Sequence, residues 1–199
     1  MKQQNVRDRL IESTIRSIAT NGLDKTTTNA IVSGTNINEA YIYTHFADKE
    51  DLFAKVFDTL DEQLATQILQ HLPLMTMPGM DFETRCRALF LAVWRLMVEN
   101  RENCLAFIRY YYSPYYIKHS AEAHWERYQP VLEKFRRIFK AEADVWMILN
   151  HMLNVMLDFA VKVHNGHMSN EDNYVEHVFR VVYRSVEQYF KEEEVKGNG

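Results

Sequence analysis

TTNAIVSGTNINEAYIYTHFADKEDLFAKVF, residues 27–57, sets the architecture of this chain. Thr27 or Thr28 provides a side-chain oxygen for the free N–H groups at the start of a short helix. Asn36 is one of the few non-glycine residues that tolerate positive φ, as a tight turn requires. Asn38 then caps a second short helix. The pattern therefore predicts two short helices joined by a turn.

Amphipathic helices flank this turn motif on both sides. The upstream apolar side chains recur at helical spacing and stop at Gly22, a residue type that suits a helix end. Downstream, Asp48 and Asp51 have the spacing of a capping box at the start of a long helix. These helices can bury a small shared core with the turn motif. The second short helix, residues 38–44, is then left exposed, where its side chains can reach base edges and phosphates in a DNA major groove.

These residues resemble the tetracycline-repressor (TetR) family of bacterial one-component regulators. The resemblance covers residues 7–57 and rests on Gly22…Thr27-Thr28…Ile31, Ile37-Asn38, Ile42-Tyr43-Thr44-His45-Phe46 and Asp48-Lys49-Glu50-Asp51-Leu52-Phe53. Asn36 and Ala40 stand where glycine is commoner in the family, and Ala40 affects how closely the backbone can approach DNA. The resemblance implies an all-α fold. It has an N-terminal three-helix DNA-binding domain with a helix-turn-helix, and a larger C-terminal helical bundle for ligand binding and dimerisation.

Exposed side chains of the turn motif are the candidates for DNA contact. Asparagine can pair with adenine, glutamate can accept from cytosine N4 and a tyrosine ring can press on a thymine methyl, so Asn38, Glu39 and Tyr41 are candidate base contacts. The resemblance assigns Tyr43, His45 and Lys49 to phosphate contacts. The alternatives are that Asn38 only caps its helix and that Tyr43 only packs beside Phe46. The predicted DNA-binding residues are Thr27, Thr28, Asn38, Glu39, Tyr41, Tyr43, His45 and Lys49.

Charge alone does not predict a nucleic-acid partner. The chain of 199 residues has a formal net charge of −4. Residues 1–49 contain six Lys and Arg against five acidic residues, a local charge of +1 that leaves −5 for the rest. This small excess of positive charge is a weak indication of nucleic-acid binding. The prediction of DNA binding therefore depends on the motif.

The cysteines and the hydropathy of the chain indicate the cellular compartment in which the protein is expected. Cys86 and Cys104, in a chain without a recognisable signal peptide, are expected to be reduced, buried thiols of a cytoplasmic protein. The most hydrophobic stretch, residues 145–163, is interrupted by polar side chains that a membrane span would not hold. We therefore expect no membrane partner. The interrupting residues are Asn150, His151, Asn154, Asp158 and Lys162.

The last two predicted helices, residues 144–165 and 170–194, carry apolar side chains over more surface than one neighbouring helix covers. Pairing them with their copies in a second chain gives a four-helix interface of two-fold type. The resemblance places the family's dimer interface in the same region. We therefore predict a homodimer through residues 144–194. The alternative is a monomer in which neighbouring helices cover both stripes.

Aromatic side chains are concentrated in the middle of the chain. As the lining of a pocket they suit a fairly large apolar or aromatic effector, or a cation. As plain core they need no ligand. The segment RYYYSPYY, residues 109–116, holds more phenol groups than a dry core satisfies, so some should face a wet cavity or the surface. The predicted ligand-binding residues are Phe90, Trp94, Met97, Phe107, Tyr110, Tyr111, Trp125 and Tyr128.

Catalytic and metal-binding patterns are missing from the sequence. Neither His164 with His167 nor His119 with His124 has ligand spacing on a helix face. The sequence has no HExxH, GxSxG or GxGxxG motif and no P-loop. We therefore expect no metal, no cofactor and no enzymatic activity.

Taken together, the sequence predicts a ligand-responsive DNA-binding transcriptional regulator with domains at residues 1–48 and 49–199. The resemblance implies a repressor that binds a pseudo-palindromic double-stranded DNA operator as a dimer, with recognition helices about 34 to 36 Å apart. A small-molecule effector would shift the long helix that begins at Asp48 and release the operator. The alternatives are a small-molecule-binding helical protein with a degenerate DNA module, and an all-α enzyme.

Overall fold

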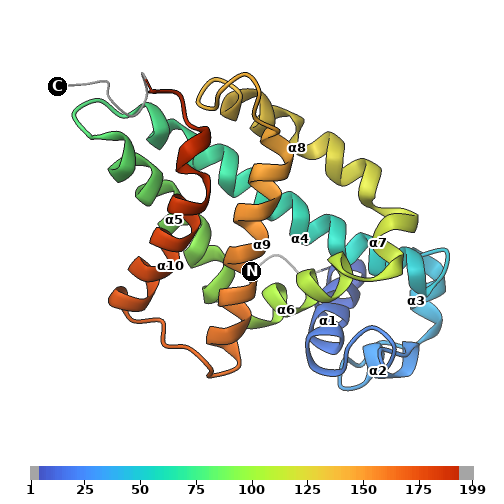
Figure 1. The fold of residues 1–199 in the computed structure, drawn as a ribbon. Coiled ribbons are helices and arrows are strands. Elements are labelled where there is room, and N and C mark those ends of the chain that lie inside the picture. Colours follow the sequence, from blue (N-terminus) through green and yellow to red (C-terminus); the bar gives the residue numbers. More distant parts are fainter. Residues whose placement is uncertain (1–4, 193–199) are drawn as a thin grey trace. The chain divides into compact units, whose positions relative to one another are not determined.

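A computed structural model of the chain describes residues 5–192. Within this range the chain is built of helices, and its β pairing is one isolated bridge between Phe139 and Phe190, which confirms the predicted all-α fold. The helices are α1 (Val6–Asn21), α2 (Thr28–Val32), α3 (Ala40–His45), α4 (Lys49–His71), α5 (Phe82–Glu99), α6 (Arg101–Tyr111), α7 (Pro114–His119), α8 (Ala121–Phe135), α9 (Val145–His164) and α10 (Asp172–Val186), with the short 3-10 helices η1 (Leu72–Thr76) and η2 (Glu187–Tyr189) (Figure 1).

Two compact units make up the chain. Of the described residues, 5–63 and 100–126 form the first unit, and 64–99 and 127–192 form the second. Helices α4 and α8 each contribute residues to both units. This division follows contacts within the fold, whereas the predicted boundary at residue 48 concerns function and stays a prediction.

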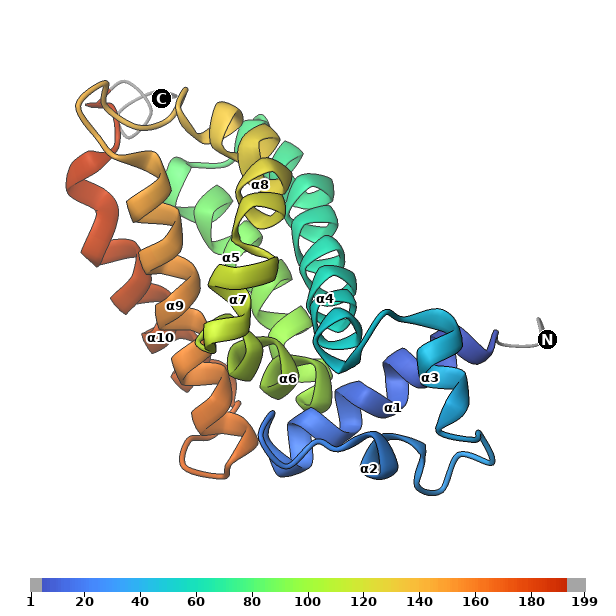
Figure 2. The ribbon, with the colours of Figure 1, turned by 90° about the vertical axis from the view of Figure 1, so that its right-hand side faces the viewer.

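The first unit has a core between α1 and the two short helices that follow it (Figure 2). Leu10, Ile31 and Ile42 are each 0% exposed, so one residue from each of α1, α2 and α3 is completely withdrawn from water. Helix α6 packs against α1. The Nη1 atom of Arg109 in α6 donates to the carbonyl of Ile18 at 2.5 Å, near the end of α1, where a cationic side chain interacts favourably with the helix dipole.

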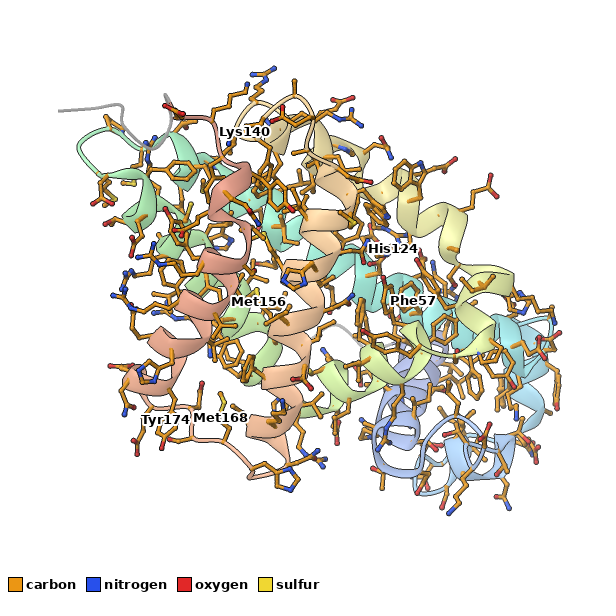
Figure 3. All side chains as sticks on the ribbon, viewed as in Figure 1. Phe57, His124, Lys140, Met156, Met168 and Tyr174 are labelled. Atoms are coloured by element: carbon orange, nitrogen blue, oxygen red, sulfur yellow. The ribbon has the colours of Figure 1, made fainter. Side chains whose placement is uncertain are left out.

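A buried polar pair lies beside the aromatic core of the first unit. The Nδ1 atom of His124 in α8 and the Oδ1 atom of Asp61 in α4 are 2.9 Å apart, and these residues are 2% and 0% exposed. The ring of His124 also lies 5.9 Å from that of Phe57, and Figure 3 labels both side chains. The sequence pattern did not predict this pair, because its partners are 63 positions apart.

The second unit is formed by η1, α5, α9, α10 and η2, with the ends of α4 and α8. Helices α9 and α10 lie side by side in both ribbon views (Figures 1 and 2). One face of α10 is buried, as Val178, Val182 and Val186 show with exposures of 1–2%. The indole N–H of Trp94 donates to the side-chain oxygen of Asn170 at 2.9 Å, which ties α5 to the loop between α9 and α10.

The end of α10 differs from its prediction. A helix to Glu194 was expected, but α10 ends at Val186, and residues 193 and 194 lie outside the described range. After η2, Lys191 donates its backbone N–H to the carbonyl of Ile138, while the carbonyl of Tyr189 accepts from Lys140. These long-range hydrogen bonds use backbone groups that a continued helix would need for its own hydrogen bonds. They also bury Phe190, which is 5% exposed.

Cys86 and Cys104 are not joined in a disulfide. Cys104 is buried, and burial raises its pKa to about 12. Cys86 is half-buried. The Cys104 thiol is therefore protonated at neutral pH, which makes it a poor nucleophile.

Helix α9 covers the most hydrophobic stretch of the chain. His151 and Asp158 on this helix are exposed. Between residues 5 and 192, no helix combines the length and apolar character that crossing a membrane requires.

Candidate nucleic-acid interface and ligand cavity

The turn motif folds through the local contacts that its sequence predicts. Thr27 is the N-cap of α2, and its hydroxyl accepts from the backbone N–H of Ala30 at 3.1 Å. In the turn, Gly34 has φ of 75° and Asn36 has φ of 54°. Asn36 is the only non-glycine residue with positive φ in the described part of the chain. Its side chain tolerates the left-handed conformation that this tight turn needs.

Helix α3 presents two different faces. Ile42 is completely buried, and Ile37 and Phe46, which flank the helix, are buried with it. On the other side, Tyr41 is 49% and Tyr43 59% exposed, although both are large aromatic residues. The remaining exposed positions on and before this helix are Asn38, Glu39, Ala40 and Thr44.

The start of α3 lies two residues later than the predicted start at residue 38. The side-chain oxygen of Asn38 accepts from the backbone N–H of Ala40 at 2.9 Å, which caps the first turn. The capping alternative for Asn38 is thus present in the structure. The residue as a whole is exposed.

A hydrogen bond connects the two short helices on their exposed side. The hydroxyl of Thr28, the first residue of α2, donates to the Oε1 atom of Glu39, which immediately precedes α3. This contact restricts the Glu39 carboxylate while its other lone pairs remain able to accept. The sequence pattern placed both residues in the interface but did not predict that they contact each other.

The beginning of α4 is capped by two aspartates. Asp48 accepts from the backbone N–H of Asp51 at 2.8 Å, and the Asp51 carboxylate accepts from the backbone N–H of Ala47 at 2.9 Å. This confirms a capping-box-like start. Lys49 is the first residue of α4, and its Nζ atom lies 5.4 Å from the centroid of the Phe53 ring.

One cationic side chain near this helix start was missed by the sequence reasoning. Lys118 of α7 donates to the Glu50 carboxylate at 2.6 Å, and His119 lies 2.9 Å from the same oxygen. These hydrogen bonds lower the pKa of Glu50, which therefore stays ionised at neutral pH. A contact across 68 positions leaves no local signal in the sequence.

All eight predicted DNA-binding residues fall on this one segment of the first unit. Five of them are exposed and three are half-buried. The half-buried residues are Thr28, His45 and Lys49.

Four of the predicted ligand-binding residues belong to the first unit, and three of these join one aromatic cluster. The ring of Phe57 lies 5.1 Å from that of Phe107, 4.9 Å from Tyr110 and 6.4 Å from Tyr111. The hydroxyl of Tyr110 bonds to that of Ser120 at 2.9 Å. Burial raises the pKa of Tyr110 and Tyr111. Trp125, the fourth residue, is 42% exposed.

The other four predicted ligand-binding residues belong to the second unit. Phe90 and Trp94 stack with centroids 5.9 Å apart, and Met97, one turn further along α5, is 4% exposed. Tyr128 lies edge-on to Trp146 of α9 at 6.5 Å. The eight residues are thus divided equally between the units, which is not visible in their sequence spacing.

An apolar cavity of about 60 Å³ lies in the second unit. Residues of η1, α5, α8, α9 and α10 line it, among them Met156, labelled in Figure 3, and Phe90 is the one predicted ligand-binding residue in its wall. Cys86 and Tyr183 supply the polar atoms of the lining residues. Burial raises the pKa of the Tyr183 phenol to about 12, so this wall is neutral at physiological pH. Between residues 5 and 192, no group of three or more His, Cys, Asp or Glu is placed to hold a metal ion.

Comparison with known proteins identifies the N-terminal segment. Residues 10–56 match the sequence model of the family described as "Bacterial regulatory proteins, tetR family". No curated protein matches the chain.

Solved structures share the fold over nearly the whole chain. A putative tetR family regulator from Shewanella sp. PV-4 is 15% identical with a TM-score of 0.75, covering 95% of this chain and 100% of its own. A TetR family regulator from Marinobacter aquaeolei VT8 is 17% identical with a TM-score of 0.70, covering 90% and 94%. A putative transcriptional regulator from Saccharomonospora viridis, solved in complex with choline, is 16% identical with a TM-score of 0.59, covering 94% and 98%.

Proposed function

We propose that this chain, which belongs to the tetR family of bacterial regulatory proteins, is a homodimeric repressor that a small molecule releases from its operator. The observation that carries the proposal is the exposed aromatic and polar face of α3, held outward by the buried Ile42. Residues 1–48 would bind DNA, and residues 49–199 would bind the effector and form the dimer. A regulator of bacterial operators works where the DNA is, so we place it in the cytoplasm.

Base recognition would be divided among three positions of the turn motif. Tyr41 can press its ring on a thymine methyl, and Glu39 can accept from cytosine N4. Asn38 uses its side-chain oxygen as a cap, so its amide nitrogen is the atom left for a base or a phosphate. Thr27, Tyr43, His45 and Lys49 would hold the backbone of the operator.

Dimerisation would use the outer face of α9 and α10. Met147 is 59%, Tyr174 43% and Val181 51% exposed, although all three are large apolar or aromatic residues. Exposed apolar residues on two adjacent helices are typical of an interface with another chain. A two-fold arrangement of these helices gives the four-helix interface predicted from the sequence.

The effector would act through a difference in affinity between two states. The relative from Saccharomonospora viridis holds choline, which supports a small-molecule site in a bundle of this fold. Because α4 begins in the turn motif and ends in the second unit, a ligand that shifts α4 would change the separation of the two recognition helices. The ligand must bind the operator-incompetent state more tightly, or the equilibrium does not move.

Replacing Lys49 by alanine is expected to weaken DNA binding on every sequence and to reduce the slope of log K against log salt by about 2 in the dimer. Two phosphate contacts, one per subunit, would be lost. The measurement is fluorescence anisotropy with the best site from a random-DNA selection at several salt concentrations. Lys55→Ala, on the same helix but paired with Asp58, is the control and should leave the slope unchanged. An unaltered slope in Lys49→Ala would contradict the phosphate contact. A wild-type protein that selects no sequence would overturn the proposed function.

Replacing Thr28 by valine is expected to reduce discrimination at the base pair that Glu39 contacts by about threefold to tenfold, because one hydrogen bond that orients the carboxylate is lost. Glu39→Gln should change the preferred base at the same position. Both effects are measured by repeating the selection with each variant. Thr59→Val, whose hydroxyl bonds to Lys55 within α4, is the control. If Thr28→Val selects the wild-type sequence with the wild-type stringency, the contact does not orient Glu39 for recognition.

A further inference from the structure

Near the start of α5 lies a buried arginine that pairs with no carboxylate in the described part of the chain. Arg85 is 7% exposed, its Nη1 atom donates to the carbonyl of Met75 at 2.9 Å, and its guanidinium lies 5.7 Å from the Phe82 ring centroid. Its Nε atom is buried without an acceptor, and no carboxylate between residues 5 and 192 forms an ion pair with it. A buried guanidinium in this state has lost hydration that its neutral partners do not replace. An anion that accepts a hydrogen bond from Nε would compensate for this lost hydration.

The apolar cavity of the second unit adjoins this arginine. Met75, whose carbonyl accepts from Arg85, lines the cavity, and so does Leu89, one turn further along the same face of α5. The Phe82 ring beneath the guanidinium lies 4.9 Å from Phe190, which is also in the wall. Arg85 itself is outside the wall. Because Arg85 is not a lining residue, a ligand in the cavity would reach its guanidinium only after a rearrangement of the wall.

The walls and the arginine together define a ligand class. We propose that this site binds a small monocarboxylate with an apolar body, whose carboxylate accepts from Arg85 and whose body fills the cavity. A carboxylate offers two oxygens in the geometry that a guanidinium matches. A doubly charged phosphate would keep one charge uncompensated, since the wall is apolar apart from Cys86 and Tyr183.

Size limits the body of this ligand. The cavity measures about 60 Å³, whereas an engineered cavity of about 150 Å³ in another protein holds benzene. Met75, Met152 and Met156 line it, and unbranched methionine side chains adjust readily to a new neighbour. A short chain is therefore the body that suits the cavity as it stands, and a single ring is the largest body that movements of these methionines would admit. The binding site is independent of the proposed function, but its role as the effector site rests on it.

The test uses benzoate as the carboxylate probe and toluene as its uncharged counterpart, titrated into the full-length protein by ligand-observed NMR. Arg85→Met is expected to weaken benzoate binding by about tenfold or more and to change toluene binding by less than about threefold. Arg95→Met, at an exposed position of the same helix and outside the cavity wall, is the control and should bind both probes as wild type does. Val182→Phe fills the cavity and should abolish binding of both. Thermal melting of each variant shows whether it is folded.

The possible results test the binding site and its role as the effector site separately. Benzoate binding that is equal in wild type and Arg85→Met overturns the assignment of Arg85, and probe binding that survives Val182→Phe in a folded protein overturns the cavity. Wild-type protein that binds neither probe overturns both. Wild-type protein that binds benzoate without any change in operator affinity supports the site and overturns its effector role. Loss of operator selection in the ligand-free protein would instead contradict the proposed function alone.

Discussion

Replacing Val181 by glutamate is expected to convert the dimer into monomers and to weaken operator binding by about 100-fold or more. Val181 is 51% exposed on α10, in the face proposed for dimerisation. In a two-fold interface the substitution introduces two unpaired carboxylates that would have to be buried. Each monomer then meets one half-site, and the gain from simultaneous engagement of both is lost. Sedimentation velocity gives the oligomeric state, and anisotropy with a two-half-site duplex gives the affinity.

The control for this prediction is the same substitution at a more exposed apolar residue. Ile117 in α7 is 74% exposed and belongs to the first unit, away from α9 and α10 in the sequence. Ile117→Glu should remain dimeric. A dimeric Val181→Glu protein with wild-type operator affinity would place the interface elsewhere.

Replacing His124 by leucine is expected to lower the free energy of unfolding by about 3 kcal/mol. His124 and Asp61 are almost completely buried and hydrogen-bonded to each other, so the substitution removes one partner of a carboxylate that water cannot reach. Leucine is similar in size to histidine, which keeps the cavity contribution small. Urea denaturation followed by circular dichroism measures the change.

Two further variants separate the polar pair from general damage. Asp158→Asn removes one member of the exposed pair with Lys162 and should change stability by less than about 0.5 kcal/mol. The double replacement of Asp61 and His124 by leucine should recover part of the loss, because it leaves no buried carboxylate. A cost below about 1 kcal/mol for His124→Leu would mean that the pair contributes little.

The features that the sequence predicted well are those whose chemistry is local. Thr27, Asn36 and Asp48 act on backbone groups within a few positions, so the residue type at each place is enough to indicate a cap or a turn. The buried face of α3 followed from helical spacing in the same way. Because these contacts are local, the fold of the turn motif could be predicted from its residue types and their spacing.

The features that escaped prediction depend on partners far away in the chain. Asp61 with His124, and Glu50 with Lys118, become neighbours only when the helices pack. Arg85 left a faint signal, since it occupies the apolar stripe between Phe82 and Leu89, but its burial required the position of η1. The aromatic residues were assigned to one lining because their periodicity does not reveal that α5 and α6 belong to different units.

The packing of Phe190 has a practical consequence for shortened versions of this protein. Its ring contacts those of Phe82, Phe139 and Tyr183, and the following Lys191 holds the loop after α8 through its backbone. A truncation that removes Phe190 would expose the three aromatic rings that it contacts and would promote aggregation. Crystallisation trials or tag removal should therefore trim the carboxyl end only beyond Lys191, even though regular helix stops at Val186.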